Sequence, residues 1–230
     1  MSDGRERREQ WATRYEQTQG EQFSWFMTSA PPQLLGLLDG PEPPPSGRAI
    51  DLGCGPGTVT AELSARFGFV VGLDYVFPAV AQARRRLESD GRAASFVVAD
   101  ASTPPFRPGS FTFVFDRGCL QNIPRDRWLT YFEQTERILA PRGVLQLLCS
   151  RTTGRASVFS GAGLKTRLRS MLGKPAEPPG PQWLSHDLLR RLAPATLQVD
   201  LMEDFPFVTQ RGNKRTFTHG LFRKTTSDRG

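Results

Sequence analysis

The sequence has little of what cross-linked, zinc-binding or membrane-spanning proteins need. Its 230 residues include only three cysteines, an odd number at wide spacing, which fits neither a disulfide framework nor a zinc site of the CxxC type. No apolar run reaches the roughly 18–20 residues that a membrane-spanning helix requires. The N-terminus lacks the apolar segment of a secretory signal. We therefore expect reduced thiols, no metal site, no membrane span and a cytoplasmic location.

Lysine and histidine are also rare, although the net charge is +7. Arginine supplies nearly all the positive charge, and most arginines lie beside glutamate on helical patterns, which is typical of solvated helix faces. An anionic partner such as nucleic acid is the alternative interpretation. With 38% hydrophobic residues, the chain has enough apolar material for one large domain.

The first 47 residues are predicted to precede the core domain. Aromatic residues and leucines follow a helical repeat from about Glu6 to Leu38, which indicates two helices joined by an aromatic elbow. The stretch from Asp39 to Gly47 is rich in proline, which disfavours both helix and central strand. We expect residues 1–47 to form a helical lid and a linker, and residues 48–230 to form the core.

Short apolar runs alternate with longer amphipathic ones in the first part of the core. The runs predict five strands, over Ala49–Leu52, Phe69–Asp74, Ser95–Ala99, Phe111–Phe115 and Val144–Cys149. Helices are predicted over Thr58–Phe67, with Thr58 as the capping residue, and over Pro78–Ser89 and Arg125–Leu139. Strands that are apolar throughout and alternate with helices are typical of a parallel sheet covered on both faces.

The C-terminal part departs from this pattern. Residues 151–181 are dominated by glycine, serine, proline and basic residues, so we expect a surface insertion. A helix is predicted over Ser185–Leu192, and strands over Ala195–Met202 and Thr216–Phe222. The link between these strands is too short for a crossover helix, so they are predicted to pair as a hairpin. The expected fold class is α/β, a doubly wound, Rossmann-like, mostly parallel seven-stranded sheet with an antiparallel last strand and helices on both faces.

The turn after the first strand is the first candidate binding site, because ligands of open α/β sheets bind beyond the carboxyl ends of the strands. It consists of Gly53, Cys54, Gly55, Pro56 and Gly57. Thr58 stands where a dinucleotide fingerprint needs glycine, and no P-loop lysine follows. Asp51, just before the turn, would repel a pyrophosphate but suits a cation. The turn is therefore expected to hold a ligand with a positive group and no phosphate.

Acidic residues also end the next three strands. Asp74, which Tyr75 follows, ends the second strand and can accept both hydrogens of a ribose diol, with a helix N-cap as the alternative. Asp100, followed by Ala101, ends the third strand and can accept from the exocyclic amine of a purine, with capping again as the alternative. The fourth strand ends in Asp116, Arg117, Gly118 and Cys119, which we expect to face a second substrate.

A ribose, a purine and a cationic amino-acid end without phosphate describe S-adenosylmethionine. Four segments resemble, in order and spacing, the successive motifs of the class I S-adenosylmethionine-dependent methyltransferases: Asp51–Thr58, Val71–Asp74, Val98–Asp100 and Arg137–Val144. The resemblance departs from the family at Arg142, where glycine is frequent. It implies S-adenosylmethionine as cofactor, bound by Asp51, Gly53, Cys54, Gly55, Gly57, Asp74, Tyr75, Asp100, Ala101, Asp116 and Trp25.

The acceptor is less determined than the donor. An N-terminal motif resembles that of small-molecule methyltransferases of the tellurite-resistance and thiopurine type; it consists of Trp11, Arg14 and Tyr15 followed by Phe23–Phe26. The Asp116–Leu120 segment resembles the same enzymes, which implies a small acceptor, such as a thiol or other soft nucleophile. Similar features occur in methyltransferases that modify protein lysine, so a protein-lysine or RNA methyltransferase is the alternative. A non-catalytic module that binds the donor is a third hypothesis. The Asp116–Cys119 segment differs from the loop of amino-methylating nucleic-acid enzymes, which disfavours nucleic acid.

Methyl transfer by in-line displacement needs positioning more than a dedicated nucleophile. No catalytic residue is therefore predicted, and His186 and His219 are expected to be structural or to lie on the surface. Phe26, Arg117 and Cys119 are the predicted substrate residues. Trp25 and Phe26 are expected either over the donor, where an aromatic face attracts a sulfonium, or in ordinary packing of the N-terminal segment.

Overall fold

The structure is a computed structural model that describes residues 3–19, 22–151, 184–208, 212 and 214–226. The predicted surface insertion at residues 151–181 lies, apart from Arg151, outside the described residues. No helix among these described ranges is long and apolar enough to cross a membrane.

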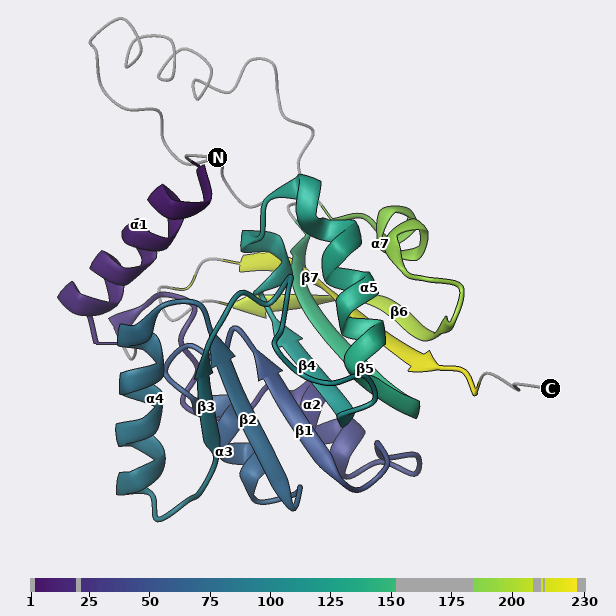
Figure 1. Cartoon of the computed structure of the whole chain (residues 1–230), viewed down its shortest axis with the longest axis horizontal. Coiled ribbons are helices and arrows are strands. Elements are labelled where there is room, and N and C mark those ends of the chain that lie inside the picture. The colour runs from purple at the N-terminus through teal and green to yellow at the C-terminus, as the bar shows by residue number, and fades with distance from the viewer. Residues whose placement is uncertain (1–2, 20–21, 152–183, 209–211, 213, 227–230) are drawn as a thin grey trace, which may run out of the picture.

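A seven-stranded sheet in the order β3-β2-β1-β4-β5-β7-β6 forms the centre of the molecule (Figure 1). Its strands are β1 Arg48–Leu52, β2 Phe69–Asp74, β3 Ser95–Val98, β4 Phe111–Arg117, β5 Leu139–Arg151, β6 Leu197–Val208 and β7 Lys214–Lys224. Strands β1 to β5 pair in parallel, whereas β7 is antiparallel to both β5 and β6. The predicted doubly wound sheet and its C-terminal hairpin are thus confirmed, and the strand order reverses beside β1.

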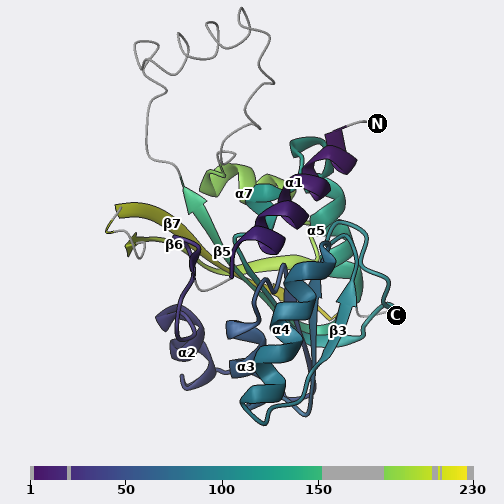
Figure 2. The same cartoon turned by 90° about the vertical axis from the view of Figure 1, so that its left-hand side faces the viewer.

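Helices cover both faces of this sheet (Figure 2). Helices α2 Pro32–Leu38 and α3 Thr58–Ser64 bury Leu34 and Leu63 in one apolar cluster with Phe113 of β4. Helices α5 Trp128–Ile138 and α7 His186–Leu192 contribute to the cluster on the other face, where Trp128 and Leu189 are fully buried. Two short 3₁₀ turns, Leu120–Asn122 and Arg125–Arg127, lead from β4 into α5.

The N-terminal helix α1, Asp3–Gln17, packs beside α4, Phe77–Ser89, rather than on the sheet (Figures 1 and 2). Tyr15 and Phe23 join Val76 and Ala79 in a separate apolar cluster. Gln82 of α4 donates its amide hydrogens to the main-chain carbonyls at the end of α1, those of residues 15 and 18, at 2.8 and 3.3 Å. The two predicted N-terminal helices with aromatic residues between them are therefore present.

The predicted cap of α3 is wrong. Gly57, not Thr58, occupies the N-cap position, with a φ of 84° that favours glycine. The Thr58 hydroxyl is buried in the first turn and has no hydrogen-bond partner among the described residues. A Cβ on Gly57 would lie 2.9 Å from the Cβ of Ala83, so this glycine also lets α3 and α4 approach closely.

Candidate active site

A cleft of about 1060 Å³ opens beyond the carboxyl ends of β1, β2, β3 and β4, where the strand order reverses. A smaller hollow of about 50 Å³ adjoins it beneath the segment that joins α1 and α2. Ligand sites in proteins usually measure about 300–1,000 Å³, so the cleft has room for a nucleoside and a small second molecule. The position of the cleft follows from the fold, because the successive parallel strands all end there.

The turn after β1 brings backbone close to the cleft. The backbone N–H groups of Gly53 and Cys54 both donate to the carbonyl of Leu73, at 2.7 and 2.9 Å, which fixes the turn against β2. Gly55 has a φ of 51°, and a Cβ there would lie 2.9 Å from the hydroxyl of Tyr15. A side chain here would clash with Tyr15, so the glycine lets the hydroxyl of Tyr15 approach the turn closely.

Asp74 joins the end of β2 to this turn. Its Oδ2 accepts from the backbone N–H of Gly55 at 3.1 Å, and its Oδ1 accepts from that of Val76 at 3.2 Å. Val76, not Asp74, is the N-cap of α4, so the alternative of an N-cap role is not what the structure shows. Burial raises the pKa of the Asp74 carboxyl to about 6. The carboxyl lines the cleft, where its oxygens can each accept a further hydrogen bond.

Asp100 also lines the cleft, but its carboxyl has partners. Oδ1 accepts from the backbone N–H and the hydroxyl of Ser102, at 2.8 and 2.7 Å. Oδ2 forms an ion pair of 2.7 Å with Nη1 of Arg127. The turn-capping role weighed from the sequence is therefore present. Ala101 follows in the wall of the same cleft and is almost fully buried.

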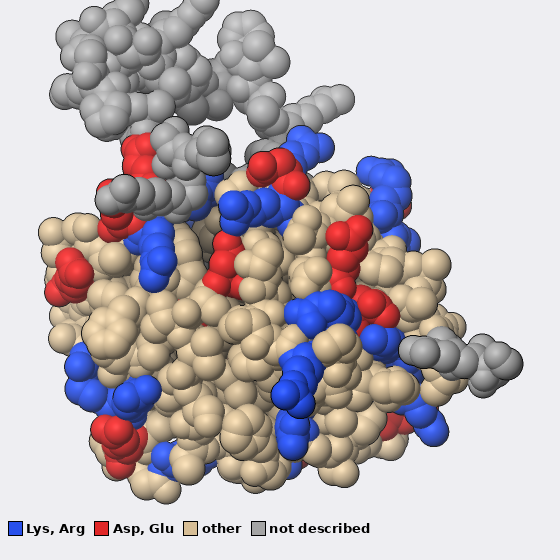
Figure 3. All heavy atoms as spheres, viewed as in Figure 1, with Lys and Arg blue, Asp and Glu red and all other residues tan. Residues whose placement is uncertain are grey.

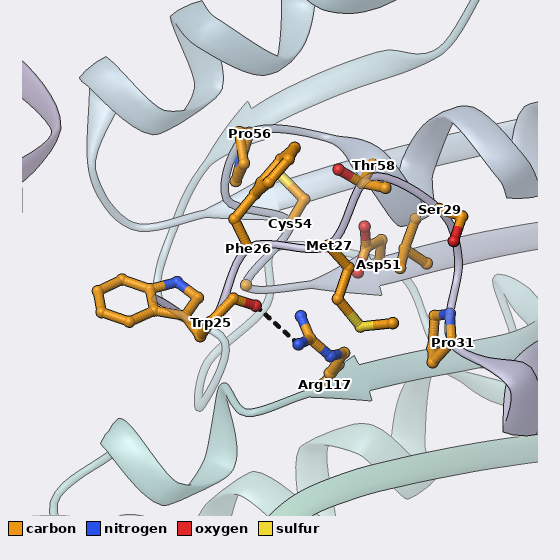
Figure 4. A pocket seen from close by; sticks show the side chains of 12 residues that line it. Trp25, Phe26, Met27, Ser29, Pro31, Asp51, Cys54, Pro56, Thr58 and Arg117 are labelled. Carbon is orange, nitrogen blue, oxygen red and sulfur yellow. Dashed lines mark hydrogen bonds between the residues drawn. The ribbon is translucent and has the colours of Figure 1, made fainter. Parts of the chain in front are cut away.

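Asp51 lies in the wall of the small hollow rather than in the cleft (Figure 4). Its Oδ2 accepts from the hydroxyl of Thr60 at 2.7 Å. Burial raises its pKa to about 7, and the charges of Asp116 and Asp74 add to that effect. Phe26 covers the same hollow and is itself buried, with the guanidinium of Arg86 5.2 Å from its ring centroid.

Asp116 is placed differently from the sequence-based expectation. Its side chain is fully buried and does not line the cleft; it accepts from the hydroxyl of Tyr131 at 2.6 Å. The same carboxyl accepts from the backbone N–H groups of Cys119 and Leu120, at 2.8 and 3.0 Å. The carboxyl thus shapes the loop after β4 rather than facing a substrate, because it points toward α5. Burial raises its pKa to about 6.

Trp25 belongs to an aromatic cluster at the mouth of the cleft. One face of its ring stacks on Phe23, with ring centroids 4.5 Å apart and planes at 9°. The ring of Trp11 meets it edge to face at 5.7 Å, and Arg14 lies over both tryptophans. Trp25 therefore packs within the N-terminal segment and also lines the cleft and the hollow.

The cleft brings together most of the predicted site residues. Its wall includes Trp25, Gly53, Cys54, Gly55, Asp74, Tyr75, Asp100, Ala101, Arg117 and Cys119. Gly57 and Asp116 lie outside it. Sequence reasoning missed a further group on α1 and the C-terminal hairpin, which comprises Arg14, Tyr15, Phe207, Arg215 and Phe217. Phe207, Arg215 and Phe217 could have been found from the predicted antiparallel pairing. That pairing places the start of β7 and the end of β6 at the carboxyl end of β5.

Neither histidine lines the cleft. His186 lies 2.8 Å from a carboxylate oxygen of Asp204. His219 is buried within the sheet, with Nδ1 3.2 Å from Glu203 and Nε2 3.0 Å from the side-chain nitrogen of Gln146. Since that nitrogen can only donate, Nε2 accepts and Nδ1 carries the hydrogen. Both histidines are thus engaged in the fold.

The sequence is similar to known methyltransferases. Residues 49–143 match a family described as a methyltransferase domain. The chain is 35% identical over 106 residues to a demethylmenaquinone methyltransferase of Clavibacter sepedonicus, which covers 46% of this chain and 42% of that protein. It is 32% identical over 168 residues to a trans-aconitate 2-methyltransferase of Methylobacterium radiotolerans, with 66% and 58% covered. The chain thus spans about half the length of these curated relatives.

Solved structures share the whole fold. A protein studied in the conversion of a disulfide bond into a thioacetal group during echinomycin biosynthesis has a TM-score of 0.74 at 22% identity, and 96% of this chain and 93% of that one are covered. An S-adenosylmethionine-dependent methyltransferase from Methanosarcina mazei has a TM-score of 0.66 at 20% identity, with 86% and 99% covered. Together with the strand order, these likenesses lead to one conclusion: residues 49–143 form a methyltransferase domain, and the chain has the fold of the class I S-adenosylmethionine-dependent methyltransferases.

Proposed function

We propose that this protein transfers a methyl group from S-adenosylmethionine to a small-molecule acceptor, with a thiol or another soft nucleophile as the favoured class. The observation that carries the proposal is the cleft around the glycine turn, Asp74 and Asp100, which has more room than a nucleoside needs. The names of the curated relatives support a small acceptor, since demethylmenaquinone and trans-aconitate are both small molecules.

The residues present fit the donor. Gly53 and Gly55 line the cleft without side chains, so a ligand can approach the backbone of the turn closely. Asp74 would accept the ribose hydroxyls, and Asp100 with Ala101 would lie along the purine. Asp51, in the adjoining hollow, would attract the cationic amino-acid end. When bound, S-adenosylmethionine supplies an electrophilic sulfonium methyl group.

The chain contributes positioning and exclusion of water. Helix α1 and Trp25 form one side of the cleft, and residues of the loop after β4 form the other. Holding donor and acceptor in line supplies much of the rate of a displacement. Because neither histidine lines the cleft, an acceptor that arrives already ionised, such as a thiolate, suits the site better than an alcohol that needs a general base.

Incubation with donor labelled in its methyl group tests the proposal. The protein is mixed with labelled S-adenosylmethionine and, separately, with a thiol library, a library of small hydroxyl and amine compounds, and macromolecules from a cell extract. Label in thiol products is expected. Label only in protein or RNA would move the acceptor to a macromolecule, and donor binding without any transfer would indicate a non-catalytic module.

A further inference from the structure

Arg117 stands where the cleft and the small hollow meet, since it lines both (Figure 4). Its Nη2 donates to the main-chain carbonyl of Trp25 at 2.8 Å. Its guanidinium lies 5.2 Å from the ring centroid of Phe207, on β6. Both partners are uncharged, so neither neutralises the cation.

No carboxylate in the described part of the chain lies within ion-pair distance of Arg117. Arg127, in the same cleft, differs in this respect because it pairs with Asp100. Asp51 is close enough to favour the charged form of Arg117, but burial dominates and lowers the pKa of the guanidinium to about 10. A partly buried cation that lacks a carboxylate partner is costly, and an anionic ligand would offset that cost.

We propose that Arg117 is the receptor for a carboxylate group of a ligand bound in this cleft. A guanidinium binds a carboxylate through two parallel N–H donors, and only one donor of Arg117 is taken by Trp25. The inference rests on the proposed function, whose two ligands can each supply the group. The amino-acid end of the donor carries a carboxylate, and an organic acid as acceptor would lie against Phe207, Phe217 and Arg215.

Binding of donor analogues tests the first source. S-Adenosylhomocysteine and 5′-methylthioadenosine share the adenosine and the thioether, but only the former has the amino-acid carboxylate. Both are titrated calorimetrically into the wild type and into the variants Arg117→Gln, Arg117→Lys and Arg191→Gln. Arg191→Gln is the control, because it removes an exposed charge on α7. If the donor supplies the group, Arg117→Gln weakens S-adenosylhomocysteine about tenfold or more, Arg117→Lys less, and methylthioadenosine stays unchanged.

Binding of an organic acid tests the second source. Phenylacetate and its neutral counterpart phenylacetamide are titrated into the same proteins, with and without saturating S-adenosylhomocysteine. If the acceptor supplies the group, the wild type prefers the acid about tenfold or more, and Arg117→Gln loses that preference while Arg191→Gln keeps it.

Two affinity ratios distinguish carboxylate binding by Arg117 from a structural role of Arg117. One is the ratio of phenylacetate to phenylacetamide, and the other is the ratio of S-adenosylhomocysteine to 5′-methylthioadenosine. A merely structural role through Trp25 would weaken all four ligands together and leave both ratios unchanged, which would overturn the proposal. If the wild type does not bind S-adenosylhomocysteine, the proposed function fails. The acid-to-amide ratio without that ligand then still decides whether Arg117 binds a carboxylate.

Discussion

At the scale of single residues, the direction of a side chain at a strand end decides whether a predicted site residue lines the cleft. Asp74 ends β2 and Asp100 follows β3, and both line the cleft. Asp116 ends β4 in an equivalent way, yet its carboxyl points to Tyr131 on α5. Local sequence locates the end of a strand, but which face the last side chain takes depends on the register of the whole strand.

We expect Asp74→Asn to weaken S-adenosylhomocysteine at least about tenfold, because the amide keeps the shape but loses one acceptor and the charge. Calorimetric titration measures the affinity, and near-ultraviolet circular dichroism checks the fold. Asp90→Asn, at an exposed position after α4, is the control and should bind as the wild type does. Unchanged affinity in Asp74→Asn would remove the ribose assignment.

Arg142 stands where the methyltransferases that the sequence resembles often have glycine, and its backbone conformation is strained. It has a φ of 65°, the one non-glycine residue of the described chain with a positive φ, and its side chain is exposed. Arg142→Gly should raise the free energy of unfolding by about 1 kcal/mol, because the left-handed conformation is unfavourable for residues with a Cβ. Urea denaturation measures this free energy. The control Arg142→Ala keeps the Cβ and should therefore show no gain in stability.

At the scale of elements, the alternation of apolar runs was sufficient to predict every strand, but not every boundary. Strands β6 and β7 are longer than expected, because each continues through residues, several of them charged, that the apolar runs did not include. Phe207 and Arg215 lie in these added lengths and were therefore missed as cleft residues, whereas Phe217 was predicted only as part of a strand. Their place in the site depends on how far the hairpin reaches over the sheet, which is a tertiary property.

The approach of α3 to α4 should depend on Gly57. Gly57→Ala is expected to lower the free energy of unfolding by about 2 kcal/mol or more, since a Cβ there is both strained and 3.0 Å or less from two atoms of Ala83. Gly91→Ala is the matched control, because Gly91 also has a positive φ but nothing within 4 Å of the added Cβ. It should cost only about 1 kcal/mol. If urea denaturation shows that both variants lose the same free energy of unfolding, the close contact between α3 and α4 at Gly57 contributes nothing to stability.

At the scale of the whole molecule, exposed charges of both signs are mixed, and a second group of charges is buried. Figure 3 shows acidic and basic side chains interspersed over the face it displays. The buried charges are the more informative ones. Asp51, Asp74 and Asp116 all have raised pKa values for the same reason, burial near the carboxyl ends of β1, β2 and β4. The cleft wall also carries part of the positive charge, since Arg14, Arg117 and Arg215 line it together with Asp74 and Asp100.

Stability should fall as the pH rises from 5 to 7.5. The three carboxyls have folded pKa values of about 6 to 7 against an ordinary value of 3.8, so the folded state holds more protons in this range. His219 acts in the opposite direction, because burial lowers its pKa, but it is one group against three. Urea denaturation at several pH values measures the slope. Asp51→Asn should flatten the slope, and a rise in stability with pH would contradict the assignment.

Strand β6 is one of the two edge strands of the sheet, and its composition bears on self-association. An exposed edge strand presents unpaired backbone groups to which another chain can add. Here Pro206 has no N–H to offer, and Asp200, Glu203 and Asp204 lie along the same strand, paired with Arg223, His219 and Arg151 respectively. A second copy aligned edge to edge would have to accommodate these charged groups. The edge is thereby protected from aggregation, so the long hairpin can extend the cleft without making the protein prone to fibre-like assembly.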